Sequence, residues 1–179
     1  MTMTLDPART ALVLVDFMPR IVALPLAPRS GDEALLAACG LAERFAAAGA
    51  LVVAVRVDRP GVAEQPPGSE LHPSVARLAG SVVVKGTVGA FHATGLDELV
   101  RARGVSTLVF GGIATNMGVE STARAASDLG YELVFAEDAM TALSAEEHEA
   151  AIRLNFPRFG TVVGCSELSV AAAPVHHSR

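Results

Sequence analysis

The sequence has few aromatic residues, few cysteines and no strongly basic segment. Aromatic side chains make up 4 % of the 179 residues, tryptophan is absent, and the two cysteines are Cys39 and Cys165. Two cysteines so far apart give neither a disulfide framework nor a metal-binding spacing. The formal net charge is −5. Together with the missing basic segment, this argues against nucleic acid and anionic membranes as partners.

Long hydrophobic runs are also missing. The longest, AAAGALVVAV at residues 46–55, has ten residues and ends before Arg56, which is too short to cross a bilayer. The first apolar run stops at Asp16 after five residues and follows Asp6 and Arg9, so we expect no signal peptide and a cytoplasmic protein. The length and the 51 % hydrophobic content predict one domain over residues 1–179, in which residues 169–179 form a surface tail.

Short apolar runs alternate with helical patterns along the chain. These runs are continuous rather than alternating, which is typical of strands buried on both faces of a parallel sheet. The order of the elements predicts an α/β fold with an open, doubly wound, six-stranded sheet. The predicted strands cover residues 10–15, 51–57, 81–84, 106–111, 132–137 and 161–164.

Helix signals lie between the strands. A helix is expected over residues 33–48, and another over 117–129. Thr94 with Asp97, and Ser144 with Glu147, have the spacing of capping boxes. The charged sequence around His148 predicts a solvent-facing position for that side chain.

Three predicted strands end in unusual residues. Asp16 follows five apolar residues, Lys85 follows three valines, and the strand over 106–111 leads into the glycine-containing turn 111–118. Ligands of open parallel sheets bind outside the carboxyl ends of the strands. The sequence therefore predicts that a carboxylate, an ammonium group and a helix start converge at one edge.

Each of these features has a structural and a functional interpretation. Asp16 is a turn residue, or a general acid or base whose pKa partial burial has shifted. Lys85 is a surface lysine, or the partner that keeps Asp16 ionised or stabilises negative charge. Thr115 and Asn116 are good helix caps, and the N–H groups of Met117 and Gly118 could bind a carboxylate or an oxyanion.

Known motifs for phosphate binding, dinucleotide binding, a serine nucleophile and metal binding are absent. The turn has no Gly-Lys-Ser/Thr ending, no G-x-G-x-x-G and no G-x-S-x-G. None of the five histidines forms an H-x-x-x-H or H-x-H pair. We therefore predict no metal and no cofactor.

Three segments resemble the isochorismatase-like hydrolase superfamily. They are ALVLVDFM, VVVKGTVGAF and GGIATNMGVESTARAASDLGYELVFAEDAMTA, in this order. The resemblance implies a Rossmann-like parallel sheet with helices on both faces and a homo-oligomer, a dimer or a tetramer. It also implies a site of Asp, Lys and Cys, in which Asp16 and Lys85 take the first two positions.

The cysteine position of this superfamily falls on Gly118, so the chain resembles a branch with glycine in place of the nucleophile. Without a thiol, a covalent thioester cannot form at this position. The cis peptide of the family would lie between Ile113 and Ala114. The nicotinamidase branch has an Asp and two His as a metal site, whereas the corresponding segment here holds Asp58 and no histidine.

The resemblance therefore implies a small-molecule hydrolase that acts on a carboxylated metabolite without covalent catalysis, as in the hydrolysis of a vinyl ether. Asp16 would be the general acid, Lys85 would hold the substrate or tune Asp16, and the helix start at Met117–Gly118 would receive a substrate carboxylate. Residues beside these positions are expected to line the pocket. They are Phe17, Met18, Thr87, Phe91, Ile113, Ala114, Thr115, Asn116 and Met117.

Two other functions are compatible with the sequence. Loss of the nucleophile is also expected in an inactive relative that binds a metabolite or a partner. An amide hydrolase that activates water in place of a thiolate is the second alternative.

Overall fold

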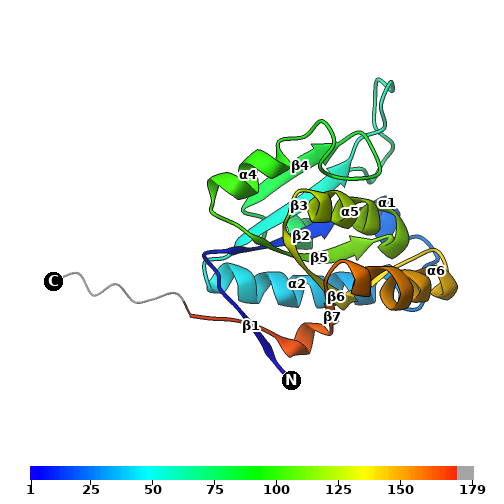
Figure 1. Ribbon diagram of the computed structural model, residues 1–179. Helices are drawn as coiled ribbons and strands as arrows, with labels where there is room; N and C mark the ends of the chain where they lie inside the picture. The colour runs from blue at the N-terminus through cyan, green and yellow to red at the C-terminus, as the bar shows by residue number, and fades with distance from the viewer. Residues whose placement is uncertain (173–179) are drawn as a thin grey trace.

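The structure, a computed structural model, describes residues 1–172 and is built around a six-stranded parallel sheet (Figure 1). The strand order is β4-β3-β2-β5-β6-β7, and every neighbouring pair is parallel. These strands are β2 (Thr10–Val15), β3 (Leu51–Val57), β4 (Ser81–Lys85), β5 (Thr107–Ile113), β6 (Glu132–Thr141) and β7 (Thr161–Val163). The predicted fold class is confirmed.

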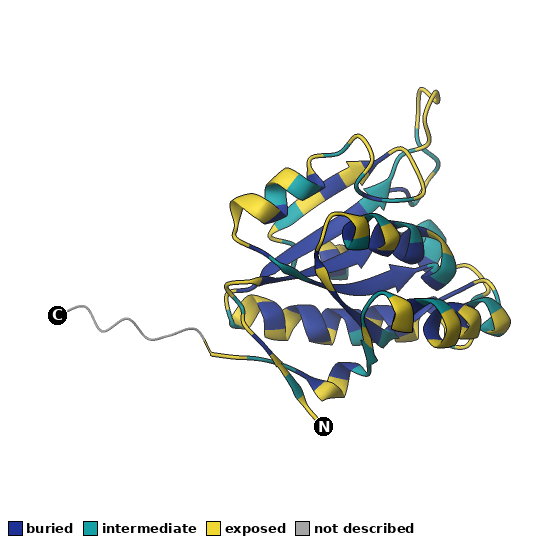
Figure 2. Cartoon of the chain, viewed as in Figure 1, coloured by how far each residue is buried: buried dark blue, intermediate teal, exposed yellow. Residues whose placement is uncertain are grey.

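Helices cover both faces of the sheet. The helices are α1 (Pro19–Val22), α2 (Gly31–Ala47), α3 (Pro73–Ala76), α4 (Leu96–Ala102), α5 (Glu120–Asp128) and α6 (Ala145–Ala150). Apolar residues of α2 and α3 pack with one set of strand side chains. Those of α4 and α5 pack with the set that points the opposite way. Figure 2 shows the buried central strands between these layers. The continuous apolar runs of the sequence are explained by this two-sided cover.

Short helical turns complete the fold. Two are π-helical, η1 (Thr115–Val119) and η2 (Ala151–Asn155), and two are 3₁₀ turns, η3 (Phe156–Arg158) and η4 (Cys165–Glu167). Strand β6 is longer than predicted because its pairing with β5 resumes after a register shift, with Gly112 opposite Met140 and Ile113 opposite Thr141.

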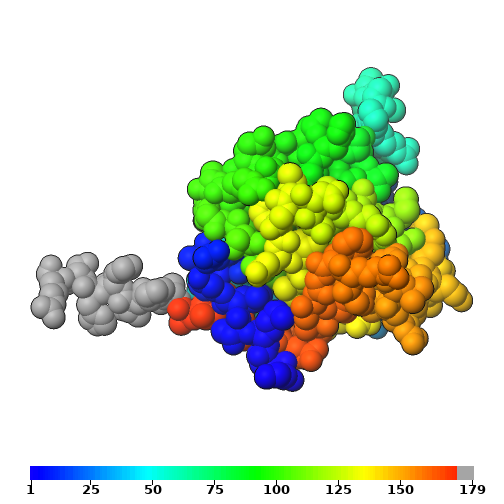
Figure 3. Space-filling model, in the orientation of Figure 1, coloured from blue at the N-terminus to red at the C-terminus, as the bar shows by residue number. Residues whose placement is uncertain are grey.

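The segment 169–179, expected to be a surface tail, is in part a strand. β8 (Leu168–Val170) pairs in parallel with β1 (Met3–Leu5), so the two ends of the described chain lie side by side (Figure 3). Leu5 and Leu168 are buried in this contact. Apolar burial beside α2 therefore holds a segment that has no strong strand pattern. Residues 173–179 of the expected tail lie outside the described residues.

Helix starts agree only in part with the sequence signals. Ser30 and Glu33 form a complete capping box at the start of α2, which therefore begins two residues earlier than predicted. The predicted box of Thr94 and Asp97 is wrong, because Gly95 caps α4 and Asp97 accepts hydrogen bonds from Tyr131 and Arg101 instead. Within the described part of the chain, no helix has both the length and the apolar character needed to span a membrane.

Candidate active site

A cavity of about 470 Å³ opens at the carboxyl edge of the sheet. The chain runs from β2 outward through β3 to β4, and then returns to place β5 on the other side of β2. This reversal between β2 and β5 is the topological switch point, where doubly wound sheets bind ligands. The lining residues are Asp16, Arg20, Ile21, Leu24, Val57, Lys85, Gly86, Thr87, Val88, Ile113, Ala114, Met117, Gly118 and Leu143.

Asp16 turns out of β2 directly into this cavity. Its φ angle of 58° lies in the left-handed region, which aspartate tolerates better than most residues. The Asp16 N–H donates to the Val55 carbonyl at 2.8 Å, and the Asp16 carbonyl accepts from the Met18 N–H at 2.9 Å. The residue is 6 % exposed. The turn that ends β2 therefore fixes a buried carboxyl group at the mouth of the sheet.

Lys85, the last residue of β4, meets Asp16 across the end of β3. Its Nζ lies 3.0 Å from Asp16 Oδ2 and donates to the carbonyls of Thr87 at 3.1 Å and Val88 at 2.7 Å. An ammonium group has three N–H donors, so these contacts use all of them. Lys85 is therefore placed to hold Asp16 rather than to bind a substrate directly.

The other oxygen of Asp16 is uncommitted. Oδ1 is buried and has no hydrogen-bond partner among the described residues. Burial raises the pKa of the Asp16 carboxyl, while Lys85 and, more weakly, Arg20 oppose this shift. A buried carboxyl group with a raised pKa and one free oxygen is suited to proton transfer.

Gly118 lies against the same pair. A Cβ atom at this position would come within 3.2 Å of Asp16 Oδ2 and 3.6 Å of Lys85 Nζ. Earlier in the same turn, the peptide bond between Ile113 and Ala114 is cis, at the position that the resemblance implied. Both cysteines, Cys39 and Cys165, are buried elsewhere and do not line the cavity. A side chain at residue 118 would thus face the ion pair, and the chain has none there.

The structure separates the predicted pocket residues into two groups. Those that line the cavity with Asp16, Lys85 and Gly118 are Thr87, Ile113, Ala114 and Met117. Phe17 and Met18 are fully buried and do not line it. Phe91 stacks on Tyr131, at 6.1 Å between ring centroids. Thr115 and Asn116 point toward α6, where Asn116 contacts Glu147.

The start of the helical turn η1 is less open than expected. Of the two N–H groups that were expected to bind a substrate carboxylate, the Met117 N–H is already used, because it donates to the Ala114 carbonyl at 3.1 Å. The physical reason is that η1 begins as a tight turn that satisfies its own donor. The role of the Gly118 N–H stays a prediction.

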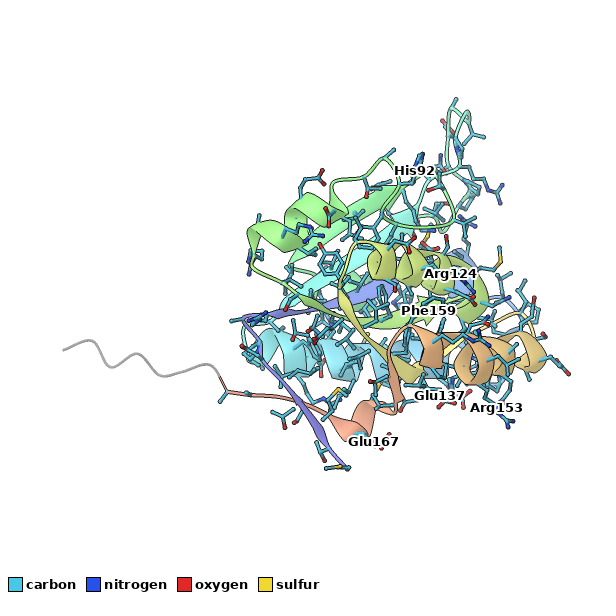
Figure 4. All side chains as sticks on the ribbon, in the orientation of Figure 1. His92, Arg124, Glu137, Arg153, Phe159 and Glu167 are labelled. Atoms are coloured by element: carbon cyan, nitrogen blue, oxygen red, sulfur yellow. The ribbon has the colours of Figure 1, made fainter. Side chains whose placement is uncertain are left out.

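His148 was expected on a solvent face and is instead fully buried. Its Nδ1 lies 2.7 Å from Thr115 Oγ1, and its Nε2 lies 3.9 Å from Oε1 of Glu137, which Figure 4 labels. Burial, aided by the charge of Arg29, lowers the His148 pKa to about 4. The imidazole is therefore neutral near pH 7 and ties η1 to α6.

A second contact holds the far end of η1. Glu120, the first residue of α5, accepts from Arg124 at 2.8 Å and from Asn155 at 3.0 Å. The Arg124 guanidinium also lies over the Phe159 ring, at 4.8 Å (Figure 4). These contacts join α5 to the η2 and η3 region behind the turn that carries Gly118.

Arg20, the third charged residue of the cavity, was not predicted from the sequence. Neither were the apolar lining residues Ile21, Leu24, Val57, Val88 and Leu143. The available signal for Arg20 was its place in a short turn that begins with Pro19, directly after the end of a buried strand.

Metal ligands do not gather in the described residues, where no group of three or more His, Cys, Asp or Glu could hold an ion. The expectation that catalysis needs no metal stays a prediction.

The fold and this cavity define a doubly wound α/β protein with a carboxylate–ammonium pair at its switch point. The family model of the isochorismatase domain matches residues 10–167 of this sequence. The chain is 38 % identical to the uncharacterized isochorismatase family protein YecD of Escherichia coli O157:H7, over 92 % of this chain and 96 % of that one. It therefore belongs to the isochorismatase family and is a hydrolase of that family.

Two further matches agree with this placement. An isochorismatase family protein from Burkholderia thailandensis has a similar structure, with a TM-score of 0.79, 34 % identity and coverage of 92 % of this chain and 95 % of that one. Streptothricin hydrolase of Streptomyces noursei is 39 % identical over 72 % of this chain and 48 % of its own length. The family thus includes a relative named as a hydrolase.

Proposed function

We propose that this protein hydrolyses a small carboxylated metabolite by acid–base catalysis without a covalent intermediate, most simply at a vinyl ether. One observation gives this proposal its main support. Asp16 lines the cavity and has a buried oxygen, Oδ1, with no described partner, while Lys85 holds the other oxygen at 3.0 Å. With Gly118 beside the pair, the cavity has an acid–base group and no thiol.

Vinyl-ether hydrolysis needs only these groups and water. Protonated Asp16 donates its proton to the terminal CH₂ carbon, and the C=C electrons form the new C–H bond, which leaves an oxocarbenium ion. Water adds to the cationic carbon and returns a proton to the Asp16 carboxylate. The resulting hemiketal then collapses to a ketone and an alcohol. For a 2-alkoxy- or 2-aryloxyacrylate the ketone is pyruvate.

The electrostatics of the pair fit a role as an acid. Burial raises the pKa of Asp16, so a larger fraction of the carboxyl is protonated than in water. Lys85 limits that shift and fixes the orientation of the carboxyl group through its three contacts. We assign Lys85 to tuning and positioning Asp16.

Amide hydrolysis is the second candidate, because the ionised form of the same free oxygen could activate water as a base. The two mechanisms require opposite protonation states of Asp16. Vinyl-ether turnover would fall as pH rises through the Asp16 pKa, and amide turnover would rise.

The test is pyruvate release from isochorismate and from 2-phenoxyacrylate, compared with ammonia release from simple amides. Asp16→Asn should reduce pyruvate release by at least about a hundredfold, the usual contribution of a general acid. Asp128→Asn, an exposed position at the end of α5, is the matched control and should keep full activity. An Asp16→Asn variant as active as the wild type would exclude the proposal. Ammonia release without any pyruvate would favour the amide mechanism.

A further inference from the structure

Arg20 is held in the cavity by a segment far away in the sequence. It lies in α1, and its Nε donates to Ser69 Oγ at 3.0 Å. Ser69 is 4 % exposed, so this contact is sheltered from water. The Arg20 N–H also donates to the Gly68 carbonyl at 3.1 Å. A Cβ atom at Gly68 would meet the Arg20 nitrogen at 3.0 Å, and its φ is 77°, so this close approach requires glycine.

The charges of the cavity do not balance. Its charged lining residues are Asp16, Lys85 and Arg20, so the net charge is +1 when Asp16 is ionised and +2 when Asp16 is protonated. Lys85 is committed to Asp16 and to two carbonyls. Arg20 has no ion pair with any carboxylate of the described residues. A guanidinium group has five N–H donors, and the contact to Ser69 uses one of them. Arg20 is therefore the cation that a ligand can reach.

The rest of the cavity wall is largely apolar. Its apolar side chains are Ile21, Leu24, Val57, Val88, Ile113, Met117 and Leu143. Four of them are substantially exposed, with Leu24 at 43 %, Val88 at 48 %, Met117 at 50 % and Leu143 at 58 %. Ligand sites that combine an apolar wall with one fixed charge favour an apolar molecule with one group of opposite charge.

We propose that Arg20 receives the carboxylate of the substrate, and that the substrate is a monocarboxylate with an apolar body whose reacting atom faces Asp16 Oδ1. This inference rests on the proposed function for the reacting atom, but the anion site itself does not depend on it. Arg20 takes the role that the start of η1 was expected to have. A second carboxylate on the ligand would meet apolar side chains or Asp16, so dicarboxylates such as isochorismate are poorer ligands than monocarboxylates.

Binding of benzoate, measured by calorimetry at pH 7, tests the anion site without any turnover. The wild type should bind benzoate more tightly than the neutral benzamide, and phthalate no more tightly than benzoate. Arg20→Met should weaken benzoate binding at least about tenfold, as expected for the loss of a charge-assisted contact. The same variant should bind benzamide as the wild type does.

Two further variants separate charge from folding and position. Arg59→Met alters an exposed arginine in the loop after β3 that does not line the cavity, and it should leave benzoate binding unchanged. Ser69→Ala should weaken benzoate binding by a few-fold, because the guanidinium loses its sheltered anchor while keeping its charge. Arg20→Lys should recover only part of the affinity, because an ammonium group lacks the forked geometry of guanidinium.

The outcomes separate the two proposals. Benzoate binding that depends on Arg20, with no pyruvate release from any vinyl ether, would retain the anion site and reject the proposed reaction. Pyruvate release with benzoate binding that is equal in wild type and Arg20→Met would retain the reaction and reject this inference. Failure of the wild type to bind benzoate, or faster turnover of isochorismate than of 2-phenoxyacrylate, would also overturn it.

Discussion

Two buried polar pairs meet at the η1 turn, and they differ in ways that separate chemistry from architecture. Asp16 and Lys85 are oppositely charged and line a cavity, and one carboxylate oxygen is left free. Thr115 and His148 are joined by one hydrogen bond at 2.7 Å, are fully buried and lie away from that cavity. Burial raises the pKa of Asp16 and lowers that of His148, so it favours the neutral form of both side chains. Only the first pair can exchange a proton with a ligand.

The largest stability effect is expected from breaking the charged pair on one side. Lys85→Met should lower the free energy of unfolding by about 3–5 kcal/mol, because it leaves a buried carboxyl group without its cation. The double variant Asp16→Asn/Lys85→Met should recover much of this loss. Urea denaturation of the single and double variants measures both values. Additive losses in the double variant would show that the two side chains do not interact energetically.

Acid should destabilise the protein through His148. The folded pKa of about 4 is below the ordinary histidine pKa of 6.5, so between these pH values the unfolded chain binds the additional proton. Stability should therefore fall by roughly 3 kcal/mol as pH drops from 6.5 to 4. His148→Gln should flatten this part of the stability curve.

The control for His148 is His92→Gln, since His92 is exposed (Figure 4). That substitution should leave the pH dependence of unfolding unchanged. Equal slopes for the wild type and His148→Gln would contradict the neutral, buried state assigned to His148.

A smaller effect is expected from the hydrogen bond of the neutral pair. Thr115→Val keeps the shape of the side chain but leaves His148 Nδ1 without its partner, which should cost about 1–3 kcal/mol. Thr107→Val, in a half-buried part of β5, is the matched control and should change stability by less than about 0.5 kcal/mol. If the neutral pair is architectural, Thr115→Val should reduce turnover per folded molecule far less than Asp16→Asn does.

Much of the sheet and the main charged pair could be predicted from sequence because they depend on local patterns. Continuous apolar runs mark strands buried on both faces, and a charged residue directly after such a run must lie at a strand end. Parallel strands then bring Asp16 and Lys85 to the same edge, although β3 separates their strands. The order of the strands was not predictable, because it depends on packing between distant segments.

The residues beside the site were harder to predict. Phe17 and Met18 follow Asp16 directly, but the turn there directs both side chains into the core. Arg20 depends on Ser69, which is 49 residues away, and no local pattern reveals this contact. His148 has charged neighbours in sequence, and its hydrogen bond to Thr115 joins segments that are distant in the chain.

The pH dependence of kcat/KM for pyruvate release from 2-phenoxyacrylate tests the central claim most directly. We expect that the rate falls as pH rises through the raised pKa of Asp16, and that Asp16→Asn removes both the activity and this dependence. Pyruvate release that rises with pH, or that persists unchanged in Asp16→Asn, would contradict the assignment of Asp16 as the acid.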